Sequence, residues 1–301
     1  MTVARHSPAI AFAVGTLGIA LFSGMDAVMK GLVLAIGAYS TMLWRSFVGV
    51  GLAGTAYGLS WKRWPQRSVL RLHVARGMLT TFMGLLFFWG LGHVPLAQAI
   101  ALAFIAPLIS LFLAAAFLGE TIGRKIIGGS LIALAGIVLI FIGQAQADLG
   151  QPAMLGSTAI LASAVCYAVN IILMRRQAQV AAPIEIAFFQ NVIVAVLLIA
   201  AWPLFGGAAL PPVDQIPFIL LAALLSTSSL LLLSWAYARA EASYLAATEY
   251  TSFLWAMLLG WLVFGESVSW LTLAGAALIV AGCFLAARRP EDCSPALEAA
   301  V

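Results

Sequence analysis

Long apolar runs, interrupted only by short polar segments, dominate this sequence of 301 residues. Several runs reach or approach the roughly 20 apolar residues that a helix needs to cross the hydrocarbon core of a bilayer. Charged residues make up 9% of the chain and hydrophobic residues 63%, whereas about a quarter of the residues in a soluble domain are charged. A chain with so little charge cannot cover a surface in water, so the sequence predicts an integral membrane protein.

We expect an all-α fold of ten transmembrane helices, because turn residues and charges divide the apolar sequence into ten spans. The first run carries Asp26 and Lys30 and has no clear cleavage site after it, so we interpret it as a retained span rather than a signal peptide. The loops are all short, which leaves no room for a soluble catalytic domain. The predicted spans are 9–30, 38–59, 71–91, 95–118, 124–143, 152–174, 184–205, 215–238, 243–264 and 268–287.

Lysine and arginine gather in alternate loops, and short loops rich in these residues stay in the cytoplasm. This asymmetry predicts that both termini are cytoplasmic and that 290–301 form a disordered cytoplasmic tail. Lys30, at the outer end of the first span, is the exception. The predicted inner loops contain Arg5, Lys62, Arg63, Arg67, Arg71, Arg124, Lys125, Arg175, Arg176, Arg239, Arg288 and Arg289.

Two copies of one pattern divide the chain. "FLGET" at 117–121 returns as "VFGES" at 263–267, which places Glu120 and Glu266 146 residues apart. The same shift pairs Trp89 with Trp235, and a shift of 144 aligns a further segment. We therefore expect a first five-helix repeat over 1–147 and a second over 148–289. Because five is odd, the second repeat enters the membrane upside down, an architecture of many secondary transporters with the substrate site between the halves.

These features resemble the drug/metabolite transporter superfamily in its EamA branch. The resemblance rests on ten spans in two halves, on "LGE" and "FGE" at the ends of the fourth and ninth spans, and on "LWRS" and "FFQN" in the second and seventh. Within the branch, the chain looks most similar to bacterial exporters of aromatic and other neutral amino acids. The resemblance implies a transporter of the bacterial inner membrane that works by alternating access. The alternatives are a carrier for a drug, vitamin or nucleotide-like metabolite, and a passive channel.

Ionisable residues within spans are costly and are therefore candidates for function. Asp26, Lys30 and Arg45 lie in the outer halves of the first two spans, and we expect them at an outer gate. The alternative is that an Asp26–Arg45 contact only ties the two spans together. The repeat pairs Asp26 with Asn170 and Arg45 with Asn191, and inversion moves these two amides to an inner gate.

Glu249 in the ninth span is the sharpest candidate for binding a substrate ammonium group or a coupling proton. The alternative is a hydrogen bond to a neighbouring helix. Tyr250 and Ser252 lie in the same segment, "AATEYTSFLW". In the fourth span, Gln98 offers a polar contact, and Pro107 suits a helix that bends beside a pathway.

Aromatic side chains are expected to line the cavity for a planar or ammonium-bearing solute, although packing against lipid or the core is the alternative for each. The candidates include Phe88, Trp89, Trp235, Tyr244 and Tyr250, and Trp89 and Trp235 are preferred because the repeat pairs them. Glu120 and Glu266, at span ends, are interpreted as structural. Glycines seven residues apart in the fifth and tenth spans predict a smooth packing face, either within the fold or at a dimer contact.

Other classes of function find no support in the sequence. No nucleophile–base motif, HExxH motif or Cys/His cluster is present, so we expect neither an enzyme nor a metal or cofactor site. The three cysteines are too scattered for a disulfide framework. The net charge of +4 is spread over short loops and does not indicate nucleic acid binding. The expected partners are a small-molecule substrate and the bilayer, with the protein a monomer or homodimer.

Overall fold

The structure is a computed structural model that describes residues 8–60, 64–106, 108–109, 112–113, 124–146, 150–237 and 248–287. Throughout these ranges the chain forms helices and short connections, without a β-strand, which confirms the all-α prediction. The elements are α1 (Pro8–Ile36), α2 (Ala38–Leu59), α3 (Arg67–Leu91), α4 (Leu96–Ala103), α6 (Arg124–Gln146), α7 (Gly150–Val180), α8 (Pro183–Ala200), α9 (Trp202–Phe205), η1 (Val213–Gln215), α10 (Ile216–Tyr237), α12 (Thr251–Phe264) and α13 (Trp270–Ala287).

Each predicted span overlaps a helix, and the main differences arise at prolines and glycines. The span predicted at 184–205 is two helices, because Pro203 stands in the first turn of α9 and Gly206 ends it in the left-handed conformation with φ 69°. In the span predicted at 95–118, α4 ends at Ala103. A proline at 107 cannot donate a backbone hydrogen bond to the carbonyl of Ala103, which accounts for that end. The predicted bend at Pro107 itself lies outside the described residues.

Five helical segments are long and apolar enough to cross a membrane by length and composition. They are Ile10–Ile36, Arg67–Leu91, Gly150–Met174, Pro183–Ala200 and Val213–Leu233. Shorter apolar helical segments are Ile127–Gly143, Thr251–Phe264 and Trp270–Gly282. Many large apolar side chains on the outside of the bundle are exposed, including Phe22, Leu131 and Trp261. An apolar outer surface of this extent is typical of a protein that faces lipid.

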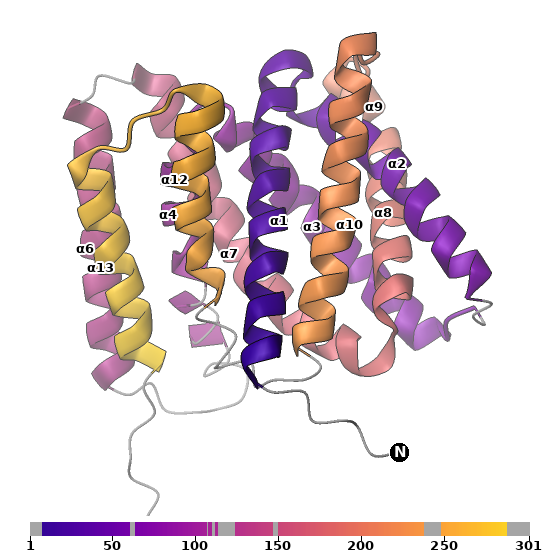
Figure 1. The fold of residues 1–301 in the computed structure, drawn as a ribbon, viewed down its shortest axis with the longest axis horizontal. Helices are drawn as coiled ribbons and strands as arrows, with labels where there is room; N and C mark the ends of the chain where they lie inside the picture. The colour runs from indigo at the N-terminus through magenta and orange to yellow at the C-terminus, as the bar shows by residue number, and fades with distance from the viewer. Residues whose placement is uncertain are drawn as a thin grey trace, which may run out of the picture.

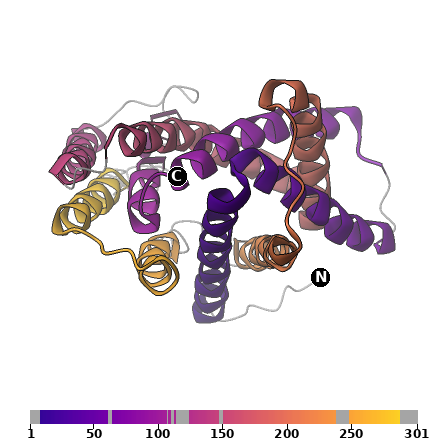
Figure 2. The same ribbon diagram turned by 90° about the horizontal axis from the view of Figure 1, so that it is seen from above.

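The most extensive helix contacts join one half of the chain to the other. They pair α6 with α13, α1 with α10, α3 with α7, and α2 with α8, while α4 also packs on α12. The α6–α13 pair lies at one edge of the molecule and the α2–α8 pair at the other (Figures 1 and 2). In the sequence repeat, α1 corresponds to α7 and α3 to α10. Exchanging the halves therefore converts the α1–α10 pair into the α7–α3 pair and leaves the other pairs unchanged, as an internal twofold axis requires.

Glycines set the direction of the pairing between α6 and α13. A Cβ atom added at Gly136 would lie 2.5 Å from the carbonyl oxygen of Gly275, and one added at Gly282 would lie 2.4 Å from that of Gly129. The repeat matches Gly129 with Gly275 and Gly136 with Gly282. Gly136 thus contacts the counterpart of Gly129, and Gly282 contacts the counterpart of Gly275. This reciprocal pattern arises only if the two helices run antiparallel about a twofold axis. The predicted glycine face is used within the fold.

Candidate functional site

A buried pair of opposite charges lies between α1 and α2. Asp26 and Arg45 attract each other electrostatically, but no hydrogen bond or ion pair directly joins them among the described contacts. Arg45 instead reaches α10, where its Nη1 atom lies 3.5 Å from Ser226 Oγ, and α3, where its guanidinium lies 5.9 Å from the centre of the Phe88 ring. The predicted contact is therefore an electrostatic attraction rather than a direct bond, and Arg45 joins the two repeats.

Unpartnered polar atoms gather around this pair. Within the described residues, buried side-chain atoms without a hydrogen-bond partner are Ser23 Oγ, Asp26 Oδ1, Thr41 Oγ1, Arg45 Nε and Gln190 Oε1. Ser23 precedes Asp26 by three residues on α1, and Thr41 precedes Arg45 by four on α2, so each pair shares one helix face. Nearly all buried polar groups in proteins are hydrogen-bonded. Four exceptions on two contacting helices are typical of a surface built to receive polar groups.

The second repeat brings Tyr167 and Glu249 to the same region. Tyr167, on α7, interacts electrostatically with Glu249, Arg76 and Asp26. Glu249 lies in a helical segment that ends just before α12, and its carbonyl oxygen accepts a hydrogen bond of 2.6 Å from Ser252 Oγ. Asp26 thus interacts electrostatically with Arg45 and Tyr167, and Tyr167 interacts in turn with Glu249. We call Asp26, Arg45, Tyr167 and Glu249 the central site.

Arg76 anchors a buried polar network between α3, α7 and α8. Its Nε atom donates to Asn170 Oδ1 at 3.0 Å and its Nη1 atom to Gln177 Oε1 at 2.6 Å. Gln177 Nε2 in turn bonds to His73 Nδ1, and His73 Nε2 lies 3.2 Å from Glu185 Oε1. Asn170, predicted at an inner gate, is therefore part of a continuous network. We call Arg76, Asn170, Gln177, His73 and Glu185 the arginine network.

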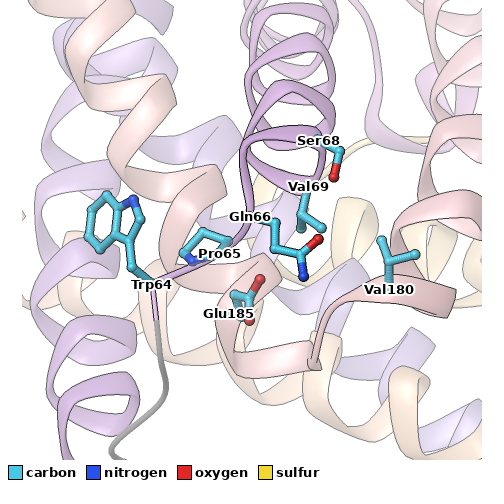
Figure 3. Close-up of a pocket in the computed structure, with 7 residues that line it drawn as sticks. All are labelled: Trp64, Pro65, Gln66, Ser68, Val69, Val180 and Glu185. Atoms are coloured by element: carbon cyan, nitrogen blue, oxygen red, sulfur yellow. The ribbon is translucent and has the colours of Figure 1, made fainter.

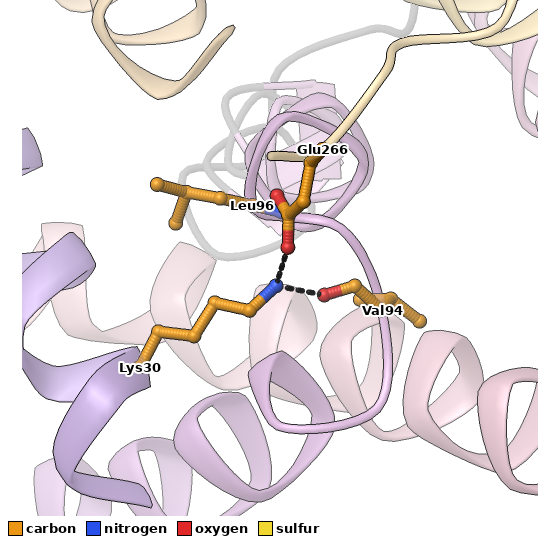
Figure 4. Close-up of polar contacts among 4 residues, drawn as sticks. All are labelled: Lys30, Val94, Leu96 and Glu266. Carbon is orange, nitrogen blue, oxygen red and sulfur yellow. Dashed lines mark hydrogen bonds and ion pairs between the residues drawn. The ribbon is translucent and has the colours of Figure 1, made fainter. Parts of the chain in front are cut away.

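A second ionic cluster occupies the opposite end of the bundle, where α12 turns into α13. Lys30 forms an ion pair with Glu266 and donates a 2.6 Å hydrogen bond to the carbonyl of Val94 (Figure 4). The other carboxylate oxygen of Glu266 accepts a 2.7 Å bond from the backbone N–H of Leu96, the first residue of α4. A carboxylate at a helix N-terminus is stabilised by the unpaired N–H groups there. Glu266 is structural, as predicted, but it binds the opposite repeat as well as ending its own span.

The other predicted residues are dispersed. Phe88 is buried beside Arg45, whereas Trp89 has 41% of its surface exposed and packs against His93. Tyr250 packs between Phe104 and Phe284.

Two predicted polar residues have local partners. The Nε2 atom of Gln98 donates to Ser157 at 3.3 Å, and the Nδ2 atom of Asn191 donates to the Ala187 carbonyl. Trp235 lies half-buried on α10. Tyr244 lies outside the described residues, as does Glu120, so the structural role predicted for Glu120 stays a prediction.

A pocket of about 450 Å³ opens where α3 and α8 begin and α7 ends (Figure 3). It is lined by Trp64, Pro65, Gln66, Ser68, Val69, Val180 and Glu185. Glu185 belongs both to this pocket and to the arginine network, so the network runs from the pocket toward Tyr167. Within the described part of the chain, no group of histidine, cysteine and carboxylate side chains has the arrangement of a metal site.

Several residues of the central site and the arginine network are not predicted from the sequence. Arg76 lies inside the predicted span 71–91, and a charge at that depth was the available signal. Gln177 and Glu185 carry no comparable signal, because a polar residue near a span end looks like an ordinary loop residue. Tyr167, inside the predicted span 152–174, looks like any aromatic residue of a membrane helix. Their role depends on α3, α7 and α8 coming together, which a single sequence does not reveal.

An antiparallel helical bundle with an apolar exterior and charges buried between two repeats defines a multi-pass membrane transporter. The family model described as "EamA-like transporter family" matches twice, at residues 9–142 and 154–288. The chain belongs to this family, whose members are transporters and not enzymes, and it is a multi-pass protein of the bacterial inner membrane that carries small metabolites.

Curated relatives include exporters and a vitamin transporter. The pseudopaline exporter of Pseudomonas aeruginosa is 28% identical over 89% of this chain and 92% of its own length. A probable terminal-alkyne amino-acid exporter of Streptantibioticus cattleyicolor is 31% identical over 67% of each chain. A riboflavin transporter of Rhizobium johnstonii is 29% identical over 64% of this chain and 61% of its own. One solved crystal structure, 22% identical, matches the fold with a TM-score of 0.62 over 93% of this chain and 97% of its own.

Proposed function

We propose that this protein is a secondary transporter that exports amino acids, including aromatic ones, by alternating access. The observation that carries the proposal is the central site, in which an arginine and two carboxyl groups from both repeats are linked by electrostatic interactions, with unpartnered polar atoms around them. The two exporters among the relatives support the direction of transport, and one of them is described as acting on an amino acid.

The chemistry of the central site suits a zwitterion. Arg45 has a buried Nε without a partner, and a guanidinium binds a carboxylate through parallel hydrogen bonds. The carboxyl groups of Asp26 and Glu249 suit an ammonium group. Phe88, beside Arg45, offers a ring for an aromatic side chain. In a zwitterion the carboxylate can bind Arg45 while the ammonium group faces Asp26 or Glu249, so both charged groups of an amino acid find a partner in the site.

The two polar clusters suit the ends of a transport pathway. We place ten spans in two inverted repeats with both termini in the cytoplasm, as the positive charges of the loops predict. The arginine network then lies on the cytoplasmic side and the Lys30–Glu266 pair on the outer side. Both clusters bridge helices that contact each other across the repeats, so each must loosen when its end of the pathway opens. Asp26, Arg45 and Lys30 on the outer side, and Asn170 and Asn191 on the cytoplasmic side, remain our candidates for the gates.

A second candidate function is transport of another small organic solute, which the similarity to a riboflavin transporter favours. Both candidates predict saturable exchange, whereas a passive channel does not. The test is counterflow with the purified protein in liposomes, with phenylalanine, tyrosine, neutral aliphatic amino acids and riboflavin as trans solutes. We expect phenylalanine to drive counterflow. Riboflavin counterflow without any amino-acid flux would select the second candidate, and flux without saturation or counterflow would contradict both.

The coupling ion is a separate part of the proposal and rests on Glu249. If this carboxylate carries a coupling proton, Glu249→Gln abolishes the pH dependence of transport while the protein still inserts into the membrane. Transport is measured with and without a proton gradient in the same liposomes. A pH profile unchanged by the substitution would remove Glu249 from proton coupling.

A further inference from the structure

The arginine network determines the protonation of His73. Arginine can only donate hydrogen bonds, so the Gln177 atom that faces Arg76 Nη1 at 2.6 Å must be the carbonyl oxygen. The amide nitrogen of Gln177 then faces His73 Nδ1 and donates to it. An acceptor nitrogen carries no proton. His73 is therefore the neutral tautomer, with its single proton on Nε2, and this proton is donated to Glu185 Oε1 at 3.2 Å.

A neutral histidine gives Glu185 a hydrogen bond but no positive charge in direct contact. The cation of the network, Arg76, is separated from Glu185 by Gln177 and His73. Tyr57, from α2, also interacts electrostatically with Glu185, but a phenol adds no positive charge. The carboxylate is buried, yet it lines the pocket at the start of α3 and α8 (Figure 3). A carboxylate that faces a pocket without a cation in direct contact is a favourable place for a positively charged group.

The remaining walls of the pocket suit an organic cation rather than a bare metal ion. Trp64 is 71% exposed and packs edge-on against Phe189 at 5.3 Å, and Phe189 in turn stacks on His73 at 4.8 Å. The apolar side chains of Pro65, Val69 and Val180 line the rest of the pocket and suit the body of an organic amine. The volume of about 450 Å³ accommodates a small amine with an aromatic or aliphatic body.

We propose that the pocket at Glu185 is a capture subsite for the ammonium group of the transported solute, distinct from the central site. The proposal rests on the proposed function and on its cytoplasmic orientation. An exporter takes its solute from the cytoplasm, where the pocket opens, and the arginine network extends from there toward Tyr167 and the central site.

The test measures the charge and occupancy of the pocket itself. Ser68, an exposed lining residue, is changed to cysteine in a protein whose three native cysteines are serines. The purified full-length protein, in phosphatidylcholine nanodiscs, is then labelled with a cationic and an anionic methanethiosulfonate reagent. We expect the ratio of cationic to anionic rates to fall about tenfold on Glu185→Gln, the size expected for one nearby charge. Gln66→Ala, which changes the same wall without altering charge, leaves the ratio unchanged.

Occupancy is tested with Glu185 in place, so the result does not depend on how well Glu185→Gln folds. We expect 2-phenylethylammonium to slow labelling of the cysteine at 68 and 3-phenylpropionate not to. Three outcomes would each overturn the proposal. Sodium at matched ionic strength could slow labelling of position 68 as much as 2-phenylethylammonium does, or labelling could be slowed only in nanodiscs of phosphatidylethanolamine. The ratio of labelling rates could also stay unchanged in Glu185→Gln. A failed counterflow experiment would contradict the proposed function. The labelling experiment requires no transport, so it can still be interpreted in that case.

Discussion

Two buried arginines of the first repeat differ in how their hydrogen bonds are used. Arg76 donates to two amides at 3.0 and 2.6 Å, whereas Arg45 has one contact of 3.5 Å and a buried Nε without a partner. A guanidinium held by amides is fixed and has its donors satisfied, while one with free donors is available to a ligand. The two residues therefore allow binding and stability to be separated experimentally.

Arg45→Gln is expected to weaken transport of amino acids but not of the corresponding amines. Losing a hydrogen bond to a charged group costs roughly 1.5–3 kcal/mol, so the half-saturation concentration for phenylalanine should rise about tenfold or more. That for 2-phenylethylammonium should stay unchanged. Arg76→Gln is the matched variant, and it should lower the melting temperature more than Arg45→Gln does. Equal losses for the amino acid and the amine would show that Arg45 does not bind the carboxylate.

The Lys30–Glu266 pair makes a prediction about stability. Lys30→Met leaves the carboxylate of Glu266 largely buried without its cation, which costs about 3–5 kcal/mol. The double variant Lys30→Met/Glu266→Gln removes both charges and keeps an acceptor for the Leu96 N–H, so it should recover part of this loss. The measurement is unfolding of the purified protein in a double-mutant cycle. Additive single effects would mean that the two charges do not stabilise each other.

For single residues, the sequence predicts which side chains are costly to bury, but not which residues they contact. Asp26, Arg45 and Lys30 stand out because charge is rare within spans. The partner of Lys30 is 236 residues away, on a turn that reads as a simple span end. Arg76 shows the same difficulty, since its two amide partners lie on α7 and resemble ordinary polar residues in the sequence.

Among the elements, the α6–α13 pair is the most closely packed, because glycines let the two backbones touch. The carbonyl oxygen of Gly275 occupies the place that a methyl group at Gly136 would need. The sequence predicts such a face from glycines at matching positions in the two repeats. It does not predict that the face is used within one chain, because the same glycines suit a contact between two chains.

Gly136→Ala should therefore be destabilising. A Cβ atom 2.5 Å from a backbone oxygen forces α6 and α13 apart, and overpacking of this kind costs roughly 1–3 kcal/mol. Gly51→Ala is the control, since a Cβ atom there meets nothing within 4 Å and alanine favours a helix. Thermal unfolding of both variants is the measurement. Equal stability of the two would mean that the pair tolerates separation.

The whole molecule is organised by the exchange of its two repeats. The constant offset in the sequence predicts two equivalent halves, and the helix pairs agree with that equivalence. Which helix of one half touches which helix of the other was not predicted, since contacts between distant segments leave no trace in a single sequence. The central site depends on those contacts, because α1, α2 and α7 each supply one of its charged or phenolic residues.

Inverted topology makes a prediction about the two faces of the membrane. Ser68 at the start of α3 and Ser267 between α12 and α13 are both exposed, and we expect them on opposite sides. A cysteine at 267 should react with an impermeant maleimide in intact spheroplasts. A cysteine at 68 should react only after the membrane is permeabilised. Labelling of both positions from the same side would contradict the ten-span arrangement.

The reciprocal contacts of the four glycines also bear on biosynthesis. All of the helices from α7 to α12 are synthesised between α6 and α13. While they are being made, the glycine face of α6 has no intramolecular partner, and lipid or the insertion machinery must cover it. The first repeat can therefore insert into the membrane before the second is made, but the glycine face of α6 is covered by its partner helix only after α13 has been synthesised.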